Sequence, residues 1–413
     1  MKYLIQAKHV NSIEAKINLP SSKSIANRVL IINSLSSSPY PIQNLSESDD
    51  TQVLQAALHS NDSLLNVGHA GTAMRFLAGF LSQVLGSWQL TGSDRMKQRP
   101  IGVLVEALRK LGAEIVYLEK DGFPPLQIEG KKLCGAVLEL DGSVSSQYIS
   151  SLLMIAPTLQ GGLTLRLQNK ITSRSYIDMT LALMESYGVK SQWISETEIV
   201  IKEQKYSSRP FAVESDWSAA SYWYELLAML PQGEIFLPNL QLKSLQGDCA
   251  IASWFECFGV QSYEQEGGVL LKKVEQIQPE RLDLNFILTP DMAQTMAVLC
   301  VMKQVPFHFS GLETLKIKET NRIAALQNEL TKFGASLHEP AHGELSWDGT
   351  FPFAKKECPL ILTYHDHRMA LAFAPAALII PMEIDDPMVI TKSYPKYFDD
   401  LRSVGFLVDD VVD

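Results

Sequence analysis

The chain has 413 residues, of which 46% are hydrophobic, and a formal net charge of −10 at pH 7. This length predicts two or three domains with ample core, and the negative charge argues against nonspecific nucleic-acid binding. The five cysteines are scattered and form no CxxC motif, which indicates reduced cytosolic thiols and excludes a disulfide framework or a zinc site.

The N-terminal stretch MKYLIQAKHV is too short and too polar for a signal peptide. The longest apolar run, MALAFAPAALIIPM from Met369, is shorter than a membrane span and is interrupted by prolines. We therefore expect a cytoplasmic protein with neither a membrane nor a nucleic acid as partner.

The first predicted helix, residues 21–35, reads SSKSIANRVLIINSL. Its serines are typical helix caps, but Lys23 and Arg28 lie near an N-terminus where the helix dipole already presents positive charge. Cations in this position favour an anionic ligand. The alternative is an ordinary capped helix whose cations extend into solvent.

Helices of the same kind, each with a polar start and a small-residue apolar body, follow along the chain. From the second onward they recur about every 73 residues, which indicates a repeat architecture. The six segments are residues 21–35, 69–81, 143–156, 215–230, 289–302 and 364–378. Helices that are apolar all round are expected to be buried. Their polar starts are then expected to share one wet surface and to attract phosphates and carboxylates.

A second series lies between these helices, in which an amphipathic helix ends at a glycine and a strand, a turn and another strand follow. The glycines are Gly112, Gly188, Gly259, Gly334 and Gly405. Glycine just past a helix end is the usual left-handed cap. The two series together predict an α/β fold built from repeated βαβαββ-type units. The first unit is shortened, because no glycine-plus-hairpin segment follows VLQAALHS.

Several polar motifs coincide with the helix starts or with loops near them. They are GHAGTAMRF, TGSDRMKQRP, DGSVSSQ, PDMAQT, KIKETNRI, YHDHRMA and TKSYPKYF. Each has an ordinary structural alternative: Asp291 could be a simple N-cap, and Lys318 and Arg322 could be i,i+4 neighbours on a solvated helix face. The histidines of YHDHRMA lack further partners at metal-ligand spacing, so we expect no metal site.

The chain contains no GxxxxGK[ST] phosphate loop, no strand-flanked GxGxxG, no HExxH and no GxSxG. Kinase and dehydrogenase functions therefore lose their usual support. A site with many anion-binding groups and carboxylates that move protons remains.

Four further segments are LPSSKSIANR, ESDD, SRSYIDMT and LQGD. Taken together and in chain order, from Leu19 to Phe398, all these segments resemble the EPSP synthase family of enolpyruvyltransferases. The resemblance implies two inside-out α/β barrel domains. One spans residues 19–213, the other residues 1–18 plus 214–413, and the chain crosses between them near Leu19 and Glu214. It also implies that the enolpyruvyl group of phosphoenolpyruvate is transferred to the 5-hydroxyl of shikimate 3-phosphate, with release of phosphate. We expect no metal or organic cofactor, and a monomer.

The resemblance also implies residue roles. Asp291 is expected to accept the hydroxyl proton, Glu319 to protonate the methylene carbon, and Lys23 to stabilise charge. The residues expected to bind shikimate 3-phosphate are Lys23, Ser24, Arg28, Ser145, Ser146, Gln147, Ser173, Tyr176, Asp291, Thr314 and Lys318. Those expected to bind phosphoenolpyruvate are Lys23, Gly71, Arg99, Gln147, Arg322, Arg368 and Lys392. Thr314 stands where the family often has asparagine.

Two other functions remain open. The sister UDP-N-acetylglucosamine enolpyruvyltransferases carry a cysteine on the loop that corresponds to TGSDRMKQRP, and this loop has none. A catalytically inactive anion-binding scaffold would need no acid–base pair, so the presence of Asp291, Glu319 and Lys23 together argues against it.

Overall fold

The computed structural model describes residues 1–7, 9–275 and 278–411. The chain divides into two compact units. We call Ser21–Val213 the continuous unit, and Met1–Pro20 together with Glu214–Asp413 the split unit. The division falls at Pro20 and Val213, beside the crossings that the sequence suggests near Leu19 and Glu214.

The continuous unit alternates helices and short strands. Its helices are α1 (Lys23–Leu35), α2 (Asp49–His59), α3 (Gly71–Leu81), α4 (Asp94–Lys97), α5 (Gly102–Lys110), α6 (Ser146–Ile155) and α7 (Arg174–Ser186). Its strands are β3 (Ile42–Gln43), β4 (Leu64–Asn66), β5 (Gly86–Thr91), β6 (Glu114–Tyr117), β7 (Leu126–Gly130), β8 (Val137–Asp141), β9 (Leu163–Gln168), β10 (Ser191–Trp193), β11 (Glu198–Ile201) and β12 (Phe211–Ala212).

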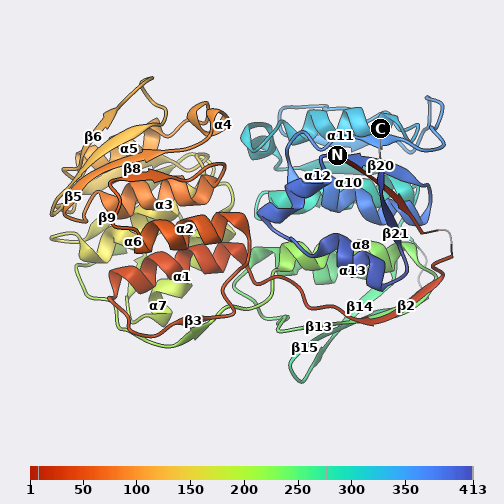
Figure 1. The fold of residues 1–413 in the computed structure, drawn as a ribbon, viewed down its shortest axis with the longest axis horizontal. Coiled ribbons are helices and arrows are strands. Elements are labelled where there is room, and N and C mark those ends of the chain that lie inside the picture. The colour runs from red at the N-terminus through yellow and green to blue at the C-terminus, as the bar shows by residue number, and fades with distance from the viewer. Residues whose placement is uncertain (8, 276–277, 412–413) are drawn as a thin grey trace. The chain divides into compact units, whose positions relative to one another are not determined.

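Two four-stranded sheets of this unit share one topology, with orders β4-β5-β7-β6 and β8-β9-β11-β10. In each, a parallel pair flanks a helix in the chain, α3 or α6, and an antiparallel hairpin completes the sheet. The first repeat keeps only a parallel pair, β3 with β12, and α2 leads to β4 without a hairpin between them. Figure 1 shows the helices of this unit and the sheets that border them.

The helices α1, α3, α6 and α7 pack on one another. Nearly every residue of α3 and α6 is buried, as predicted for helices that are apolar all round. The hydrophobic side chains of these helices form one core with the inner faces of the sheets. Burial of this apolar surface is the main force that stabilises the unit.

The split unit repeats the pattern. Its helices are α8 (Trp217–Met229), α9 (Ile251–Trp254), α10 (Ala293–Met302), α11 (Arg322–Thr331), α12 (His367–Phe373) and α13 (Tyr397–Ser403). Short 3₁₀ turns adjoin them, among them η2 (Gly247–Ala250), η3 (Phe255–Phe258), η4 (Pro290–Met292) and η5 (Glu313–Ile317). Its strands are β1 (Lys2–Gln6), β2 (Ser12–Lys16), β13 (Gln232–Pro238), β14 (Val260–Gln265), β15 (Gly268–Lys273), β16 (Leu282–Asn285), β17 (Phe307–Ser310), β18 (Leu345–Trp347), β19 (Leu360–Ile361), β20 (Met382–Asp385) and β21 (Leu407–Val411).

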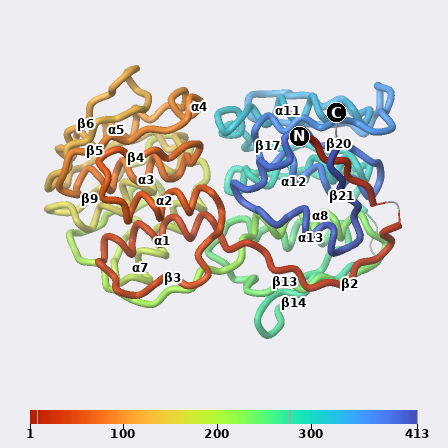
Figure 2. Tube along the Cα trace, viewed as in Figure 1, coloured from red at the N-terminus to blue at the C-terminus, as the bar shows by residue number. Residues whose placement is uncertain are grey.

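The sheets of the split unit have the orders β2-β13-β15-β14, β16-β17-β18 and β19-β20-β1-β21. Strand β1, from the N-terminus, pairs antiparallel with both β20 and β21 from the C-terminal region, and Figure 2 shows these distant segments side by side. The first residues of the chain therefore complete the last repeat.

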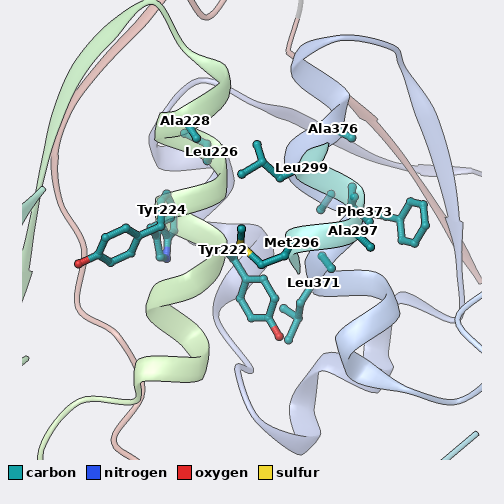
Figure 3. Packing of buried hydrophobic residues seen from close by; sticks show 14 of the residues in the cluster. Tyr222, Tyr224, Leu226, Ala228, Met296, Ala297, Leu299, Leu371, Phe373 and Ala376 are labelled. Carbon is teal, nitrogen blue, oxygen red and sulfur yellow. The ribbon is translucent and has the colours of Figure 1, made fainter. Parts of the chain in front are cut away.

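The helices α8, α10 and α12 form the centre of the split unit, because α10 packs against both of the others. Figure 3 shows Tyr222 and Leu226 of α8 turned toward Met296 and Leu299 of α10. All seven residues of α12 are buried. Because these helices bury every side, only their ends present polar groups to a ligand.

All five predicted cap glycines adopt a positive φ, between 76° at Gly259 and 99° at Gly405. A residue with a Cβ is strained in this conformation, so the prediction of left-handed caps is confirmed. Two neighbouring elements differ from expectation. The helix before Gly259 is only α9 followed by the 3₁₀ turn η3. The strand expected after Gly334 is reduced to one isolated bridge between His338 and Ser346.

No helix in the described part of the chain is long and apolar enough to cross a membrane. All five cysteines are free thiols.

Candidate active site

The first turn of α1 holds a lysine where the helix dipole disfavours a positive charge. Ser22 caps the helix, since its Oγ accepts a hydrogen bond from the backbone amide of Ile25 at 3.4 Å. Lys23 follows as the first helical residue, and its Nζ lies 3.7 Å from the Asp50 Oδ2 on α2. One carboxylate therefore offsets part of the unfavourable position of this cation.

One turn further along α1, Arg28 is a buried cation with neutral partners. Its guanidinium donates hydrogen bonds to the Thr180 Oγ1 at 2.8 Å, the Ser150 Oγ at 3.0 Å and the carbonyl oxygen of Ser24 at 2.8 Å. It also lies over the rings of Phe76 and Tyr176. No carboxylate among the described residues lies within ion-pair distance of it. Burial lowers the pKa of Arg28 to about 10, because the guanidinium lacks an anionic partner.

The starts of α3 and α6 meet in the same unit. The Gln147 amide Nε2 donates a hydrogen bond to the Thr72 Oγ1 at 3.2 Å. Ser145 caps α6, and Ser146 is its first residue. Ser173 precedes α7 in a left-handed conformation with φ of 54°, which is costly for a residue with a Cβ and is common at functional sites. Together with the contact of Arg28 and Ser150, these bonds link the starts of α1, α3 and α6.

Gly71 and Arg99 lie directly against each other. A Cβ placed on Gly71 would come within 2.7 Å of the Arg99 Nη1, so only glycine leaves room for the guanidinium in this position. The buried Arg75 fastens the loop that carries Arg99, because it donates hydrogen bonds to the carbonyl oxygens of Gly71 at 3.1 Å and Pro100 at 3.3 Å. The sequence analysis did not include Arg75 among the site residues.

In the split unit, one buried arginine joins three carboxylates. Arg322, the first residue of α11, is 1% exposed. Its guanidinium contacts the Asp366 carboxylate at 2.7 and 3.2 Å, the Asp291 Oδ1 at 2.7 Å and the Glu319 Oε2 at 2.9 Å. Burial opposes the charged form, but the three carboxylates outweigh it and raise the pKa of Arg322 above its usual value.

Asp291 lies among three cations. Besides Arg322, its Oδ1 is 3.4 Å from the Lys318 Nζ, and its Oδ2 is 3.2 Å from the Arg368 Nη2. Burial alone would raise the pKa of Asp291, but Lys318, Arg368 and Arg322 hold it well below the usual value. Thr289 and Met292, not Asp291, hold the N-cap positions of η4 and α10, so the alternative of a simple N-cap is wrong.

The alternative that Lys318 and Arg322 are i,i+4 neighbours on a solvated helix face is also wrong. Lys318 lies before α11 with φ of −78° and ψ of −147°, which is not a helical conformation. It therefore does not share a helix face with Arg322, and Asp291 lies between the two cations instead.

Arg368 connects the other helix starts of this unit. It lies in the first turn of α12, and its Nη2 donates a hydrogen bond to the Ser218 Oγ of α8 at 3.2 Å as well as contacting Asp291. The starts of α8, α10 and α12 therefore share one end of the split unit, whereas a surface common to all six helix starts stays a prediction. The Lys392 Nζ donates to the carbonyl oxygen of His365 at 2.7 Å.

This cluster places cations beside carboxylates. Three cations, at positions 318, 322 and 368, lie near three carboxylates, at positions 291, 319 and 366. Guanidinium and ammonium groups of this kind bind phosphates and carboxylates through charge-assisted hydrogen bonds. Across the described residues, no group of three or more His, Cys, Asp or Glu side chains is placed to hold a metal ion.

Most of the chain matches one known protein family. Residues 7–60 and 55–401 match the family described as EPSP synthase (3-phosphoshikimate 1-carboxyvinyltransferase). The chain belongs to the EPSP synthase family.

Two relatives of this EPSP synthase family member carry the name 3-phosphoshikimate 1-carboxyvinyltransferase. The chain is 51% identical over 407 residues to the 3-phosphoshikimate 1-carboxyvinyltransferase of Bacteroides fragilis (strain YCH46), covering 98% of each chain. It is 37% identical to the enzyme of that name from Vibrio cholerae serotype O1 (strain M66-2), covering 94% of this chain and 96% of the relative. The solved structure of EPSP synthase from Acinetobacter baumannii is similar in fold, with a TM-score of 0.78 at 18% identity, and the match covers 99% of this chain and 100% of that one.

Within this EPSP synthase family member, the structure brings the predicted residues together in two groups. One group in the continuous unit includes Arg28 with Tyr176, and Gly71 with Arg99. The other, in the split unit, joins Asp291, Lys318, Glu319, Arg322 and Arg368. Thr314 lies in η5, which contacts the turn η4 that holds Asp291, but its buried Oγ1 has no hydrogen-bond partner among the described residues.

Proposed function

We propose that this chain transfers the enolpyruvyl group of phosphoenolpyruvate to the 5-hydroxyl of shikimate 3-phosphate, giving 5-enolpyruvylshikimate 3-phosphate and phosphate in aromatic amino acid biosynthesis. The observation that carries this proposal is the 51% identity, over 98% of both chains, to a curated 3-phosphoshikimate 1-carboxyvinyltransferase. The buried cation clusters support it, because both substrates are polyanions.

The transfer requires an addition followed by an elimination. The 5-hydroxyl oxygen bonds to C2 of phosphoenolpyruvate while the hydroxyl loses its proton and the methylene carbon gains one. The bond from C2 to the phosphate oxygen then breaks, and the new methyl group loses a proton to restore the double bond. A base near the hydroxyl, an acid near the methylene and cations around the phosphate are therefore needed.

We assign these tasks to residues of this chain. Asp291 accepts the hydroxyl proton, Glu319 protonates the methylene carbon, and Lys23 stabilises developing charge and passes a proton to the departing phosphate. For shikimate 3-phosphate we propose Lys23, Ser24, Arg28, Ser145, Ser146, Gln147, Ser173, Tyr176, Asp291, Thr314 and Lys318. For phosphoenolpyruvate we propose Lys23, Gly71, Arg99, Gln147, Arg322, Arg368 and Lys392.

The low pKa of Asp291 constrains this assignment. A carboxylate held among Lys318, Arg322 and Arg368 is a weak base. When the anionic groups of phosphoenolpyruvate engage Arg322 and Arg368, part of this positive charge is neutralised and the basicity of Asp291 increases. Proton abstraction is then favoured only when both substrates are bound.

We also propose that each unit is an inside-out α/β barrel of three repeats, and that the protein is a cytoplasmic monomer. The parallel pairs β3 with β12 and β2 with β13, which join distant parts of each unit, support this. Carboxylates carry both proton transfers and side-chain cations offset the charge, so the proposed reaction requires no metal or organic cofactor.

Phosphate release in the presence of both substrates tests the proposal. Phosphate should appear only when phosphoenolpyruvate and shikimate 3-phosphate are both present, with 5-enolpyruvylshikimate 3-phosphate identified by mass spectrometry. Release with UDP-N-acetylglucosamine instead would assign the sister reaction, and binding without release would indicate a scaffold. Either result would overturn the proposal.

Lys23→Ala should lower turnover by about 10²–10⁴-fold while circular dichroism shows a folded protein. The matched control is Lys131→Ala, since Lys131 is a lysine of the same unit paired with Glu114 at 2.6 Å on the exposed surface. Turnover of the control should equal that of the wild type. Near-normal turnover of Lys23→Ala would remove Lys23 from the mechanism.

A further inference from the structure

The motif LQGD, residues 245–248, has no role in the mechanism above, but the structure fastens it to the start of α8. The Gln246 Oε1 accepts a hydrogen bond from the backbone amide of Trp217 at 3.1 Å, and its Nε2 donates to the carbonyl oxygen of Ser215 at 2.8 Å. Gln246 is 4% exposed. This double contact fixes the next residues of the loop relative to the helix.

The contact places a buried carboxylate beside a helix hydroxyl. Asp248 is 6% exposed, and its Oδ2 accepts a hydrogen bond from the Ser218 Oγ at 2.5 Å. Capping does not explain Asp248, because the Asp216 side chain already accepts from the amide of Ala219 and Gln246 already accepts from that of Trp217. A buried carboxylate is costly unless its interactions offset desolvation, so a further role is expected.

The Ser218 hydroxyl leads directly to Arg368. A hydroxyl has one hydrogen and two lone pairs, so donation to Asp248 turns a lone pair toward the Arg368 Nη2, 3.2 Å away. The same Nη2 contacts the Asp291 Oδ2 at 3.2 Å. Together with the contact of the Arg368 Nη1 to the Asp291 carbonyl oxygen at 3.5 Å, these contacts hold the guanidinium from two different elements.

We propose that Asp248 and Ser218 form a positioning pair that orients Arg368 for capture of phosphoenolpyruvate. The inference rests on the proposed function, in which Arg368 binds that substrate. The pair touches neither substrate and acts through Arg368. Its loss therefore weakens the binding of phosphoenolpyruvate and leaves the binding of shikimate 3-phosphate largely unchanged.

The first test is Ser218→Ala, with steady-state kinetics for both substrates. Loss of a hydrogen bond to a charged group predicts a rise of about tenfold in KM for phosphoenolpyruvate, with KM for shikimate 3-phosphate and kcat within about twofold. Equal rises in both KM values, or an unchanged KM for phosphoenolpyruvate, would overturn the proposal. Absence of phosphate release by the wild type would instead reject the proposed function itself.

Ser221→Ala is the matched control. Ser221 lies one turn along α8, is fully buried and donates to the carbonyl oxygen of Ser218 at 2.7 Å. Ser221 has the same hydroxyl group and a similar environment, but it makes no hydrogen bond to Arg368 in the described part of the chain. Its kinetics should match the wild type. A similar rise in KM for phosphoenolpyruvate would attribute the effect to α8 packing and would refute the positioning role.

Asp248→Asn supplies an independent readout through pH. The charged groups that act on Asp248 are Arg368, Asp291 and Asp216, and Cys249 adjoins it. Burial raises the pKa of Asp248 to about 6, against the opposing effects of Arg368 and Ser218. Below this pH a protonated Asp248 competes with Arg368 for the Ser218 oxygen, whereas the asparagine does not titrate.

The measurement is kcat/KM for phosphoenolpyruvate, which reports on the free enzyme, for the wild type and the variant from about pH 5.5 to 8. The phosphate of the substrate also titrates near pH 6, but it affects both proteins and cancels in their ratio. The advantage of the wild type should therefore shrink as the pH falls through about 6. A ratio that is constant with pH, or a lower KM in Asp248→Asn at pH 8, would contradict the proposal.

Discussion

The two units each bury an arginine near a helix start, yet they hold its charge in opposite ways. Arg28 of the continuous unit donates only to neutral oxygens, and its pKa falls to about 10. Arg322 of the split unit contacts three carboxylates, and its pKa rises. The Arg28 guanidinium therefore has no anionic partner among the described residues, whereas the Arg322 guanidinium has three.

This difference follows from what each site is proposed to do. A binding site for a permanent phosphate gains most from a cation without a competing carboxylate. A site that moves protons needs carboxylates, and these can remain ionised in a buried place only when cations accompany them. In the proposed mechanism, the carboxylates of the split unit carry the proton transfers, and Arg28 of the continuous unit provides affinity for the phosphate.

The largest expected effect is on the stability of the split unit. Arg322→Met should lower the free energy of unfolding by about 3–5 kcal/mol, since it leaves Asp291, Glu319 and Asp366 with one cation fewer. Denaturant unfolding at pH 7 measures this. A loss below about 1 kcal/mol would show that the carboxylates do not depend on Arg322.

The loss of stability in Arg322→Met should also depend on pH. Asp291 has a lowered pKa in the folded protein, so its contribution to stability is present above its unfolded pKa and is lost as the pH falls through its folded pKa. Arg322→Met removes part of that contribution. The stability difference between the two proteins should therefore shrink between pH 7 and about pH 3.

Arg28→Met should behave in the opposite way. The Ser150 and Thr180 hydroxyls remain hydrogen-bonded to each other at 2.9 Å, so stability should change by less than about 1 kcal/mol. Affinity for shikimate 3-phosphate should fall by about 10–100-fold, because a hydrogen-bonded charge is lost. Calorimetric titration measures the affinity. A large loss of stability with unchanged affinity would reverse the comparison.

Gly71→Ala should have the smallest effect. The new Cβ would displace the Arg99 guanidinium, which lies within 2.7 Å of it, and should raise KM for phosphoenolpyruvate by about tenfold. In an Arg99→Ala background the same substitution should add little, as a double-mutant cycle would show. Additive effects would mean that Gly71 acts independently of Arg99.

Local patterns predicted much of the fold. The cap glycines, the polar helix starts and the apolar helix bodies were correct, because each depends on backbone conformation or on burial of one segment. The prediction of a strand after Gly334 was wrong, because strand pairing depends on a partner elsewhere in the chain. The pairing of β1 with β20 and β21 also joins distant parts of the chain, and no local sequence signal indicates it.

The site divides in the same way. Asp291, Glu319 and Arg322, which the structure brings into contact, stand in motifs that the sequence singles out, whereas Asp366 appeared only as part of YHDHRMA without a role. Ser218 could have been recognised, because it occupies the same place in its repeat as Thr72, Ser146, Asp291 and Asp366. Arg75 gave no such signal, since its role is to hold a loop.

The sequence by itself determined the family, the repeat and the supply of cations and carboxylates, because these follow from residue identity and spacing. Only the tertiary structure decided which charges meet: Arg322 with three carboxylates, Arg28 with none among the described residues, and Asp248 with Ser218 beside Arg368. Such partners lie tens to hundreds of residues apart, and their interaction energy depends on distance and burial, both of which are fixed only when the helix starts of each unit are brought together.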